Sequence, residues 1–188
     1  MFAYAPAHLP PKAPLVIALH GCTQTADEYD HGTGWSSLAD NLGFAVVYPQ
    51  QQPANNPHNC FSWFLPDDIV RGHGEALSIR EMVEHAIATF AADRGKAFVT
   101  GLSAGGAMAS VMLATYPEVF AGGAIIAGLP YGCASNVSTS IRGHVRGAQT
   151  SRAGPWRSRA GSIQTSRPMA ENLGMVRHER SHRKTIQR

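Results

Sequence analysis

A short strand-like stretch that ends in a Gly-Leu-Ser-Ala-Gly turn constrains this chain more than any other feature of its sequence. Residues 98–100 (Phe-Val-Thr) precede the turn, Ser103 lies at its centre, and small and apolar residues follow it. The G-x-S-x-G order in this context predicts a strand, a sharp turn and a helix, with the Ser103 hydroxyl raised at the edge of a sheet. Such a turn packs too closely to admit a Cβ at Gly101 or Gly105. The alternative is a glycine-rich turn in which Ser103 only caps the helix.

Strand-like and helix-like stretches alternate on both sides of this turn. Continuous apolar runs predict strands, which we place at 14–19, 44–48, 96–100 and 120–127. Helices are predicted at 34–42, 75–93 and 104–116. Strands separated by helices imply right-handed crossovers between parallel strands. The sequence therefore predicts an α/β fold with a mostly parallel sheet and helices on both faces, in which 120–127 is one more buried strand.

The composition of the chain changes abruptly near Ala134. Residues 1–134 contain five Lys and Arg against eleven Asp and Glu, whereas residues 135–188 contain eleven against two. The second segment also has eight serines and no sustained apolar periodicity. A segment of this kind cannot bury enough apolar surface to offset its ordering entropy. We therefore expect a partial folded domain over 1–134, followed by a disordered basic Arg/Ser-rich tail over 135–188.

Bulk properties argue against two classes of partner. No run of about 18 apolar residues is present, so no transmembrane helix is expected. The first residues, 1–6, lack the basic start and the long apolar centre of a secretory signal. The basic tail on its own would allow a nucleic-acid-associated protein. Nucleic acid is the less favoured alternative, because the tail lacks aromatic interleaving and nothing in 1–134 supports such a partner.

A serine nucleophile needs hydrogen-bond donors for the negative charge that develops on the substrate oxygen. The backbone N–H of Ala104 directly follows the predicted nucleophile and is the first such donor. The second donor of this arrangement comes from a loop after an early strand, which here holds His20, Gly21 and Cys22. We assign it to the N–H of Cys22. The Cys22 thiol is interpreted as a small buried group that fills space.

Seven ordered blocks of sequence resemble one family. They are H-G-C-T-Q-T-A at 20–26, G-W-S-S-L-A-D at 34–40, Y-P-Q-Q at 48–51, N-N-P-H-N-C-F-S-W-F at 55–64, R-G-H-G-E-A-L-S-I at 71–79, T-G-L-S-A-G-G-A-M at 100–108 and Y-P-E-V-F-A-G-G-A-I-I-A-G-L-P-Y-G-C-A at 116–134. Together they resemble the poly(3-hydroxybutyrate) depolymerase and feruloyl/acetylxylan esterase family of α/β-hydrolases. The resemblance covers about residues 14–134.

The resemblance implies a serine esterase with an α/β-hydrolase fold and Ser103 as its nucleophile. It implies a polyester or an acylated polysaccharide as the ester substrate. It also implies an extracellular or periplasmic location. Acyl transfer to water through a serine needs no metal and no organic cofactor, and no C-x-x-C or H-E-x-x-H pattern in the chain indicates a metal site. The oligomeric state is left open.

The acid and the base of the expected triad are not identifiable from the sequence. In this fold an Asp or Glu and then a His follow the serine on loops after later strands, yet no Asp follows Asp93 here. The remaining candidates all lie in the basic tail: His144, His178, His182, Glu171 and Glu179. We therefore expect the C-terminal strands of the sheet to be missing, with a frameshift or truncation from about residue 135 as the hypothesis. A catalytically inactive remnant of such an esterase is the alternative to an active enzyme.

Two further assignments concern the long polar loop that follows the strand at 44–48. Trp63 lies in this loop, where an exposed ring near the turn at Ser103 would contact polymer or feruloyl groups, and simple packing is the alternative. Cys60 and Cys133 are assigned as a disulfide, which a secreted member of the family would allow.

Overall fold

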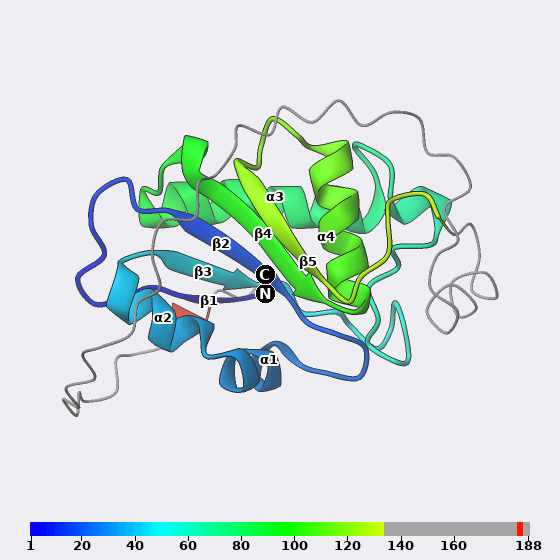
Figure 1. The fold of residues 1–188 in the computed structure, drawn as a ribbon, viewed down its shortest axis with the longest axis horizontal. Helices are drawn as coiled ribbons and strands as arrows, with labels where there is room; N and C mark the ends of the chain where they lie inside the picture. The colour runs from blue at the N-terminus through cyan, green and yellow to red at the C-terminus, as the bar shows by residue number, and fades with distance from the viewer. Residues whose placement is uncertain (134–183, 186–188) are drawn as a thin grey trace, which may run out of the picture.

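The computed structural model describes residues 1–133 and 184–185, which form a twisted sheet between two layers of helices (Figure 1). The strand order is β5-β4-β2-β3-β1-β6. Strands β5, β4, β2 and β3 run parallel, β1 is antiparallel to β3, and β6 is antiparallel to β1. The strands are β1 (Phe2–Tyr4), β2 (Leu15–Leu19), β3 (Ala45–Tyr48), β4 (Ala97–Leu102), β5 (Gly122–Ile126) and β6 (Lys184–Thr185).

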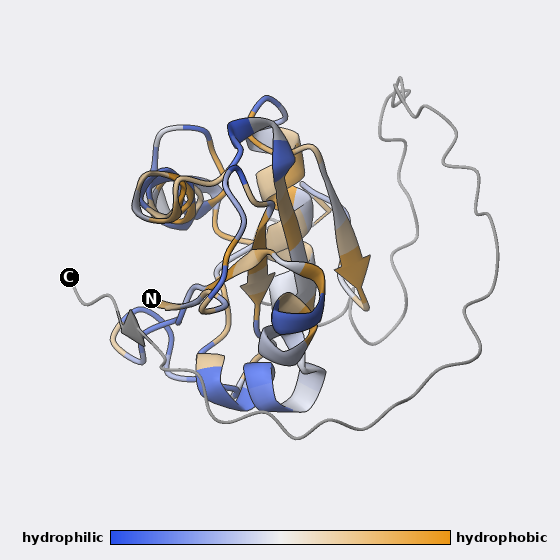
Figure 2. Ribbon diagram, turned by 90° about the vertical axis from the view of Figure 1, so that its left-hand side faces the viewer, coloured by the Kyte–Doolittle hydropathy of each residue, from blue (hydrophilic) through white to orange (hydrophobic). Residues whose placement is uncertain are grey.

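Four α-helices cover the two faces of the sheet. They are α1 (Ala26–Thr33), α2 (Trp35–Leu42), α3 (Gly74–Phe90) and α4 (Ala104–Thr115), and two short 3-10 turns are η1 (Pro66–Asp68) and η2 (Arg94–Lys96). Alternate residues of β2 point to opposite faces. Leu15, Ile17 and Leu19 pack in one buried cluster with α3 and α4, whereas Val16 and Ala18 pack in a second cluster with α1 and α2. Figure 2 shows hydrophobic colour along the strands and, among the described elements, no helix beyond the strand at the right-hand side.

Local sequence explains where α1 and α2 begin and end. Thr25 caps α1 by accepting from the Glu28 amide, while the Glu28 side chain accepts from the Thr25 amide, which is a capping box. Gly34 and Gly43 end the two helices at φ values of 72° and 70°, which favour glycine. The carboxylate of Asp30 ties this layer to β3, because it accepts from Tyr48 Oη at 2.6 Å.

The predicted parallel sheet with helices on both faces is confirmed, and so are the strands and helices that flank Ser103. Among the described α-helices and strands, three were not predicted: α1, whose sequence is mostly polar, the three-residue β1 and the two-residue β6. The strand predicted at 120–127 is present as β5, but the prediction that it is buried is wrong. Strand β5 leaves Ile125 and Ile126 nearly half exposed, because among the described residues only β4 pairs with it and no helix covers its outer face.

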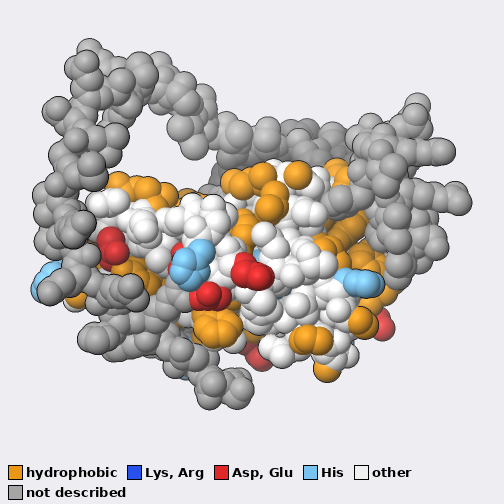
Figure 3. All heavy atoms as spheres, turned by 90° about the horizontal axis from the view of Figure 1, so that it is seen from below, with side chains coloured by type: hydrophobic (Ala, Val, Ile, Leu, Met, Phe, Trp, Pro, Cys, Tyr) orange, Lys and Arg blue, Asp and Glu red, His pale blue; other side chains and the backbone are white. Residues whose placement is uncertain are grey.

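The division predicted at residue 134 falls at the end of the first described segment. Apart from β6, the predicted basic tail lies outside the described residues. On the described face seen from below in Figure 3, acidic and histidine side chains are scattered among apolar ones, and no lysine or arginine is visible there. None of the helices in the part of the chain that the structure describes is long and apolar enough to cross a membrane.

Candidate active site

Ser103 lies in a tight turn between β4 and α4, at the carboxyl edge of the sheet. Its backbone has φ 56° and ψ −117°, a conformation that non-glycine residues rarely adopt and that surrounding contacts must hold in place. The Ser103 N–H donates to the Ile126 carbonyl at 2.9 Å, and the Ser103 carbonyl accepts the Ala107 N–H at 2.9 Å, one of the first hydrogen bonds of α4. The turn is therefore fixed both to β5 and to the helix.

The two glycines of this turn stand where no Cβ fits, as predicted. A Cβ at Gly101 would lie 2.3 Å from the carbonyl oxygen of Gly105. A Cβ at Gly105 would lie 2.2 Å from the carbonyl oxygen of Leu19 and 2.5 Å from that of His20. These atoms belong to the backbone, so no side-chain movement relieves the clash. Because neither position carries a Cβ, the backbones of strand β2 and helix α4 can pack closely beside the turn that holds Ser103.

The loop after β2 runs beside this turn. Leu19 is in register with Gly101 across the parallel pair β2 and β4. A Cβ at Gly21 would lie 3.5 Å from the carbonyl oxygen of Leu102, so the two loops are in contact directly before Ser103. The segment 20–22 and the segment 102–104 are thus neighbours, which is the placement that an oxyanion site needs.

In the loop after β2, one backbone amide makes no hydrogen bond within the described residues, whereas its neighbours do. The Gly21 N–H donates to Gln24 Oε1 at 2.8 Å, and the Thr23 N–H donates to the His58 carbonyl at 2.7 Å. No hydrogen bond within the described part of the chain uses the N–H of Cys22. The N–H of Ala104 opens α4, where the first amides of a helix have no partner within it. The two amides assigned from the sequence are therefore both available for an external acceptor.

His20 supports the loop from inside and was not predicted as a site residue. Its side chain is fully buried and hydrogen-bonds through both ring nitrogens, and its ring centroid lies 4.8 Å from that of Phe61, with the two rings tilted by 42°. Nδ1 lies 2.8 Å from the Gly21 carbonyl oxygen, and Nε2 lies 3.1 Å from the Gln51 backbone nitrogen. Since Nε2 accepts the Gln51 N–H, Nδ1 carries the ring proton. The sequence signal that could have indicated this role is a histidine directly before a glycine at the end of a strand.

This arrangement predicts a pH-dependent stability. Burial lowers the pKa of His20 below its ordinary 6.5, although the hydrogen bond to Gly21 partly opposes this. Because the unfolded chain then binds a proton that the folded chain does not, stability falls as the pH drops below about 6.5. We expect the difference in free energy of unfolding between the wild type and His20→Gln to shrink as the pH is lowered from about 7.5 to about 5.5. Urea unfolding at several pH values measures it, and a difference that does not change with pH would contradict the assignment.

The disulfide predicted between Cys60 and Cys133 is wrong. Cys60 is bonded to Cys22, with their Cα atoms 4.2 Å apart, and Cys133 is a free, exposed cysteine. The strand order explains the pairing, because β2 and β3 are neighbours and the loops at their carboxyl ends meet. Cys133 follows β5, which β4 and β2 separate from β3. The interpretation of the Cys22 side chain as a space-filling thiol is corrected by the same bond.

The disulfide should make a large contribution to stability. It closes a loop with a sequence separation of 38, for which the loss of unfolded-state entropy corresponds to about 4 kcal/mol. We expect the double variant Cys22→Ser with Cys60→Ser to lower the free energy of unfolding by about this amount in urea titrations. Cys133→Ser is the matched control and should leave it unchanged. Equal stability of the double variant and the control would show that the bond is not formed in solution.

Trp63 is not an exposed contact for polymer or aromatic substrate groups. It is only 5% exposed and packs edge-on against Phe64, with ring centroids 5.5 Å apart. Phe61 is buried beside them, so the segment 61–64 enters the core of the α3 and α4 face instead of lining the surface. The alternative reading, simple packing, is the one that the structure supports.

The residues that the sequence offers as the acid and the base for Ser103 all belong to the tail. The histidines and glutamates of the tail, from His144 to His182, lie outside the described residues. His20 is excluded as a base for Ser103, since both of its ring nitrogens are already bonded. The structure thus brings together Ser103, Ala104 and Cys22, and it places Trp63 and Cys133 elsewhere.

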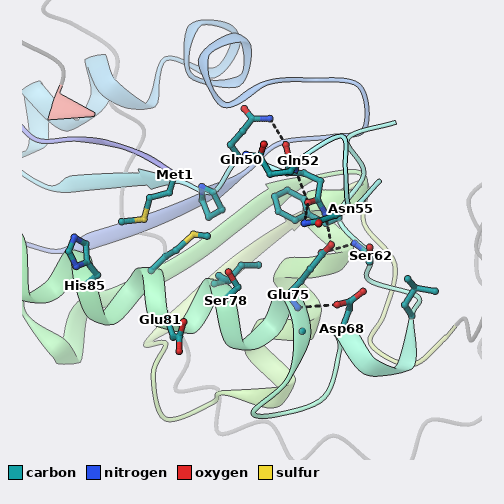
Figure 4. Close-up of a pocket in the computed structure, with 17 residues that line it drawn as sticks. Met1, Gln50, Gln52, Asn55, Ser62, Asp68, Glu75, Ser78, Glu81 and His85 are labelled. Atoms are coloured by element: carbon teal, nitrogen blue, oxygen red, sulfur yellow. Dashed lines mark hydrogen bonds between the residues drawn. The ribbon is translucent and has the colours of Figure 1, made fainter. Parts of the chain in front are cut away.

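A cavity of about 600 Å³ lies between the loop after β3 and helix α3 (Figure 4). It is lined by polar side chains that include Gln51, Ser62 and Glu75, with Met1 and His85 at its far end. Glu75 is largely buried, and burial raises the pKa of its carboxyl group, while hydrogen bonds from Ser62 and Gln51 act in the opposite direction. Ser103 is not among the residues that line this cavity.

Comparisons with known proteins find related sequences that cover most of this chain. The family model described as Esterase PHB depolymerase matches residues 2–158, past the boundary predicted at residue 134. The poly(3-hydroxyalkanoate) depolymerase C of Paucimonas lemoignei is 55% identical over 141 residues, which are 75% of this chain and 34% of that protein. A probable acetylxylan esterase A of Aspergillus fumigatus is 38% identical over 76% of this chain and 38% of its own length. A feruloyl esterase B of Neurospora crassa is also 38% identical, over 74% of this chain and 47% of its own length.

A solved structure shows the same fold. The acetyl xylan esterase from Aspergillus awamori matches with a TM-score of 0.67 and 34% sequence identity, covering 73% of this chain and 49% of that one. The predicted α/β-hydrolase fold is confirmed. The chain spans 34% to 47% of the length of the three curated relatives.

Proposed function

We propose, because the chain belongs to the PHB depolymerase family of esterases, that it hydrolyses carboxylic esters through an acyl-enzyme on Ser103. The observation that carries this proposal is the backbone of Ser103, held at φ 56° in the turn between β4 and α4. Non-glycine residues adopt such a conformation where the surrounding structure enforces it, and functional sites are where it recurs. The family resemblance stated from the sequence is confirmed by the same comparisons.

In the proposed reaction, Ser103 Oγ attacks the ester carbonyl carbon and gives up its proton to a general base. The carbonyl oxygen becomes an oxyanion, which accepts hydrogen bonds from the Ala104 and Cys22 amides. The C–O bond to the alcohol then breaks, the alcohol leaves with a proton, and water hydrolyses the acyl-enzyme. Each amide donor in such a site contributes roughly 2.7–4 kcal/mol to the stability of the transition state.

The substrate that we propose is a polyester or an acylated polysaccharide outside the cytoplasm. A 55% identical relative is named a poly(3-hydroxyalkanoate) depolymerase, and 38% identical relatives are named acetylxylan and feruloyl esterases. Hydrolysis rates on a hydroxybutyrate oligomer, acetylated xylan and a feruloylated sugar separate these classes. We expect the ester that represents the natural substrate class to be hydrolysed at least tenfold faster than the other two.

The experiment that tests the proposal is ester hydrolysis by the purified full chain. With p-nitrophenyl butyrate we expect a burst of p-nitrophenol equal to the enzyme concentration, followed by slower turnover, because this activated ester acylates the serine faster than water removes the acyl group. Absence of both burst and turnover would support the alternative that the chain is an inactive remnant of an esterase.

A further inference from the structure

The loop after β3 holds a buried glutamine, Gln51, whose side-chain polar atoms are all hydrogen-bonded. Gln51 is 4% exposed. Its Nε2 donates to the Cys60 carbonyl at 3.2 Å and to the Glu75 carboxylate. Its Oε1 accepts the Gln52 N–H at 2.8 Å and Asn55 Nδ2 at 3.2 Å. A buried amide with all four of its hydrogen bonds made fixes one local arrangement of the backbone around it.

The backbone N–H of Gln51 connects this group of hydrogen bonds to His20. The Gln51 N–H donates to His20 Nε2 at 3.1 Å, which leaves the ring proton on Nδ1 for the Gly21 carbonyl at 2.8 Å. That carbonyl and the N–H of Cys22 belong to one peptide unit. The described chain has no cis peptide bond, so the two groups point in opposite directions. Holding the Gly21 carbonyl toward His20 therefore turns the Cys22 N–H away from it.

The other connections between the two loops do not control this rotation. The disulfide holds the Cys22 side chain, and the hydrogen bond from the Thr23 N–H to the His58 carbonyl fixes the next peptide. Neither involves the Gly21 carbonyl. Within the loop, the Gln24 N–H also donates to this carbonyl, at the longer distance of 3.3 Å. The shorter contact, from His20 at 2.8 Å, is the one that connects the carbonyl to Gln51 outside the loop.

Glu75 anchors this chain of hydrogen bonds at its far end. It lies in the first turn of α3 and accepts from Gln51 Nε2 and from the Ser62 N–H at 2.7 Å (Figure 4). A negative charge is favoured at a helix N-terminus. The charged group that faces it is Asp68, whose carboxylate accepts the Glu75 N–H at 3.2 Å. Helix α3 packs against α4, which begins with the other predicted donor, Ala104.

We propose that Gln51 is a positioning residue for the oxyanion site, acting with Glu75 through His20 to orient the peptide that carries the Cys22 N–H. This inference rests on the proposed function, in which that N–H binds the oxyanion. A purely structural role would change stability and leave the chemical step of the folded enzyme unaltered. A positioning role lowers kcat and weakens binding of tetrahedral inhibitors, while KM changes little.

The test compares Gln51→Met and Glu75→Gln with the wild type and with Gln52→Ala, a change at the exposed neighbouring residue that keeps the backbone hydrogen bond of residue 52. For each of the first two variants we expect kcat on p-nitrophenyl butyrate to fall about 10- to 100-fold, the loss typical of a displaced catalytic group. We expect KM to stay within about twofold and the Ki of phenylboronic acid, which forms a tetrahedral adduct with the serine, to rise in proportion to the loss in kcat. Gln52→Ala should match the wild type.

Three outcomes would overturn the proposal: unchanged kcat in a folded variant, a change in KM without a change in the boronate Ki, or failure of both variants to fold. If only Gln51→Met fails to fold, Glu75→Gln decides. Amide hydrogen exchange of residues 20–24 gives a readout that does not need catalysis. If the wild type hydrolyses no ester, the proposed function fails. Faster exchange of this loop in the two variants, but not in Gln52→Ala, then still supports the positioning role, and unchanged exchange overturns it.

Discussion

Ser103→Ala should abolish ester hydrolysis while leaving the fold intact. Removing the nucleophile of a serine hydrolase costs on the order of 10⁴- to 10⁶-fold in kcat, because the acyl-enzyme can no longer form. The side chain is small and only partly buried at the edge of the sheet, so its loss creates no cavity in the core. Steady-state hydrolysis of p-nitrophenyl butyrate and a urea unfolding curve measure the two effects on the same preparation.

The matched control for this variant is Ser78→Ala, which removes an exposed serine hydroxyl on α3. It should retain wild-type kcat. If Ser103→Ala keeps more than about a tenth of the wild-type rate, the proposed nucleophile is wrong, since a residual rate of that size exceeds what serine removal leaves in such enzymes.

Gly105→Ala should lower the free energy of unfolding by about 3 kcal/mol, at the upper end of the usual cost of overpacking. The added Cβ would lie 2.2 Å from the Leu19 carbonyl oxygen and 2.5 Å from that of His20. Relieving this contact requires β2 and α4 to separate, which also displaces the loop that carries Cys22. Activity should therefore fall together with stability.

Gly32→Ala is the matched control for this effect. Gly32 lies within α1, and a Cβ there would meet nothing within 4 Å. Alanine at such a helical position should be neutral or stabilise the protein by up to about 1 kcal/mol. Urea titrations of the two variants give the comparison. Equal stabilities would mean that β2 and α4 are not packed as closely as described.

The elbow and the parallel sheet could be predicted because their signals are local. The apolar runs of β2, β3 and β4 are continuous, and the glycines at 101 and 105 follow from the steric demands of the turn itself. Strand β1 was missed because its stability comes from its pairing with β3. Helix α1 has a mostly polar sequence and depends in part on the contact of Asp30 with Tyr48, although its capping box at Thr25 and Glu28 was a local signal. Neither element has an apolar period long enough to be recognised.

The positions of the proposed backbone donors could be predicted from the sequence, whereas the side chains that support them could not. Ser103, Ala104 and Cys22 follow from positions directly after β4 and β2, and the structure brings them to the same edge of the sheet. The disulfide partner of Cys22 depends on strand order, which the sequence did not specify. Trp63 was misread because the loop after β3 turns back into the core. The role proposed for Gln51 and Glu75 depends on a contact between the loop after β3 and the first turn of α3, across 24 residues of the chain.

Strand β5 forms an exposed edge of the sheet, and the chain is shorter than its curated relatives. Strand β5 is paired, within the described residues, with β4 only, and Ile126 at its end accepts the Ser103 N–H. The chain spans less than half of each of the three curated relatives. The predicted nucleophile and oxyanion donors lie in the described part of the chain, and the acid and base candidates named from the sequence lie outside it.

The most direct test of the central claim is covalent labelling of Ser103. We expect a fluorophosphonate to modify the full chain at one site, with a tryptic peptide containing Ser103 carrying the phosphonate mass and with no labelling of Ser103→Ala. Fluorophosphonates react with activated serines, so this outcome requires both the elbow and a base that serves it. No adduct on folded wild-type protein, or an adduct at another serine that persists in Ser103→Ala, would contradict the account.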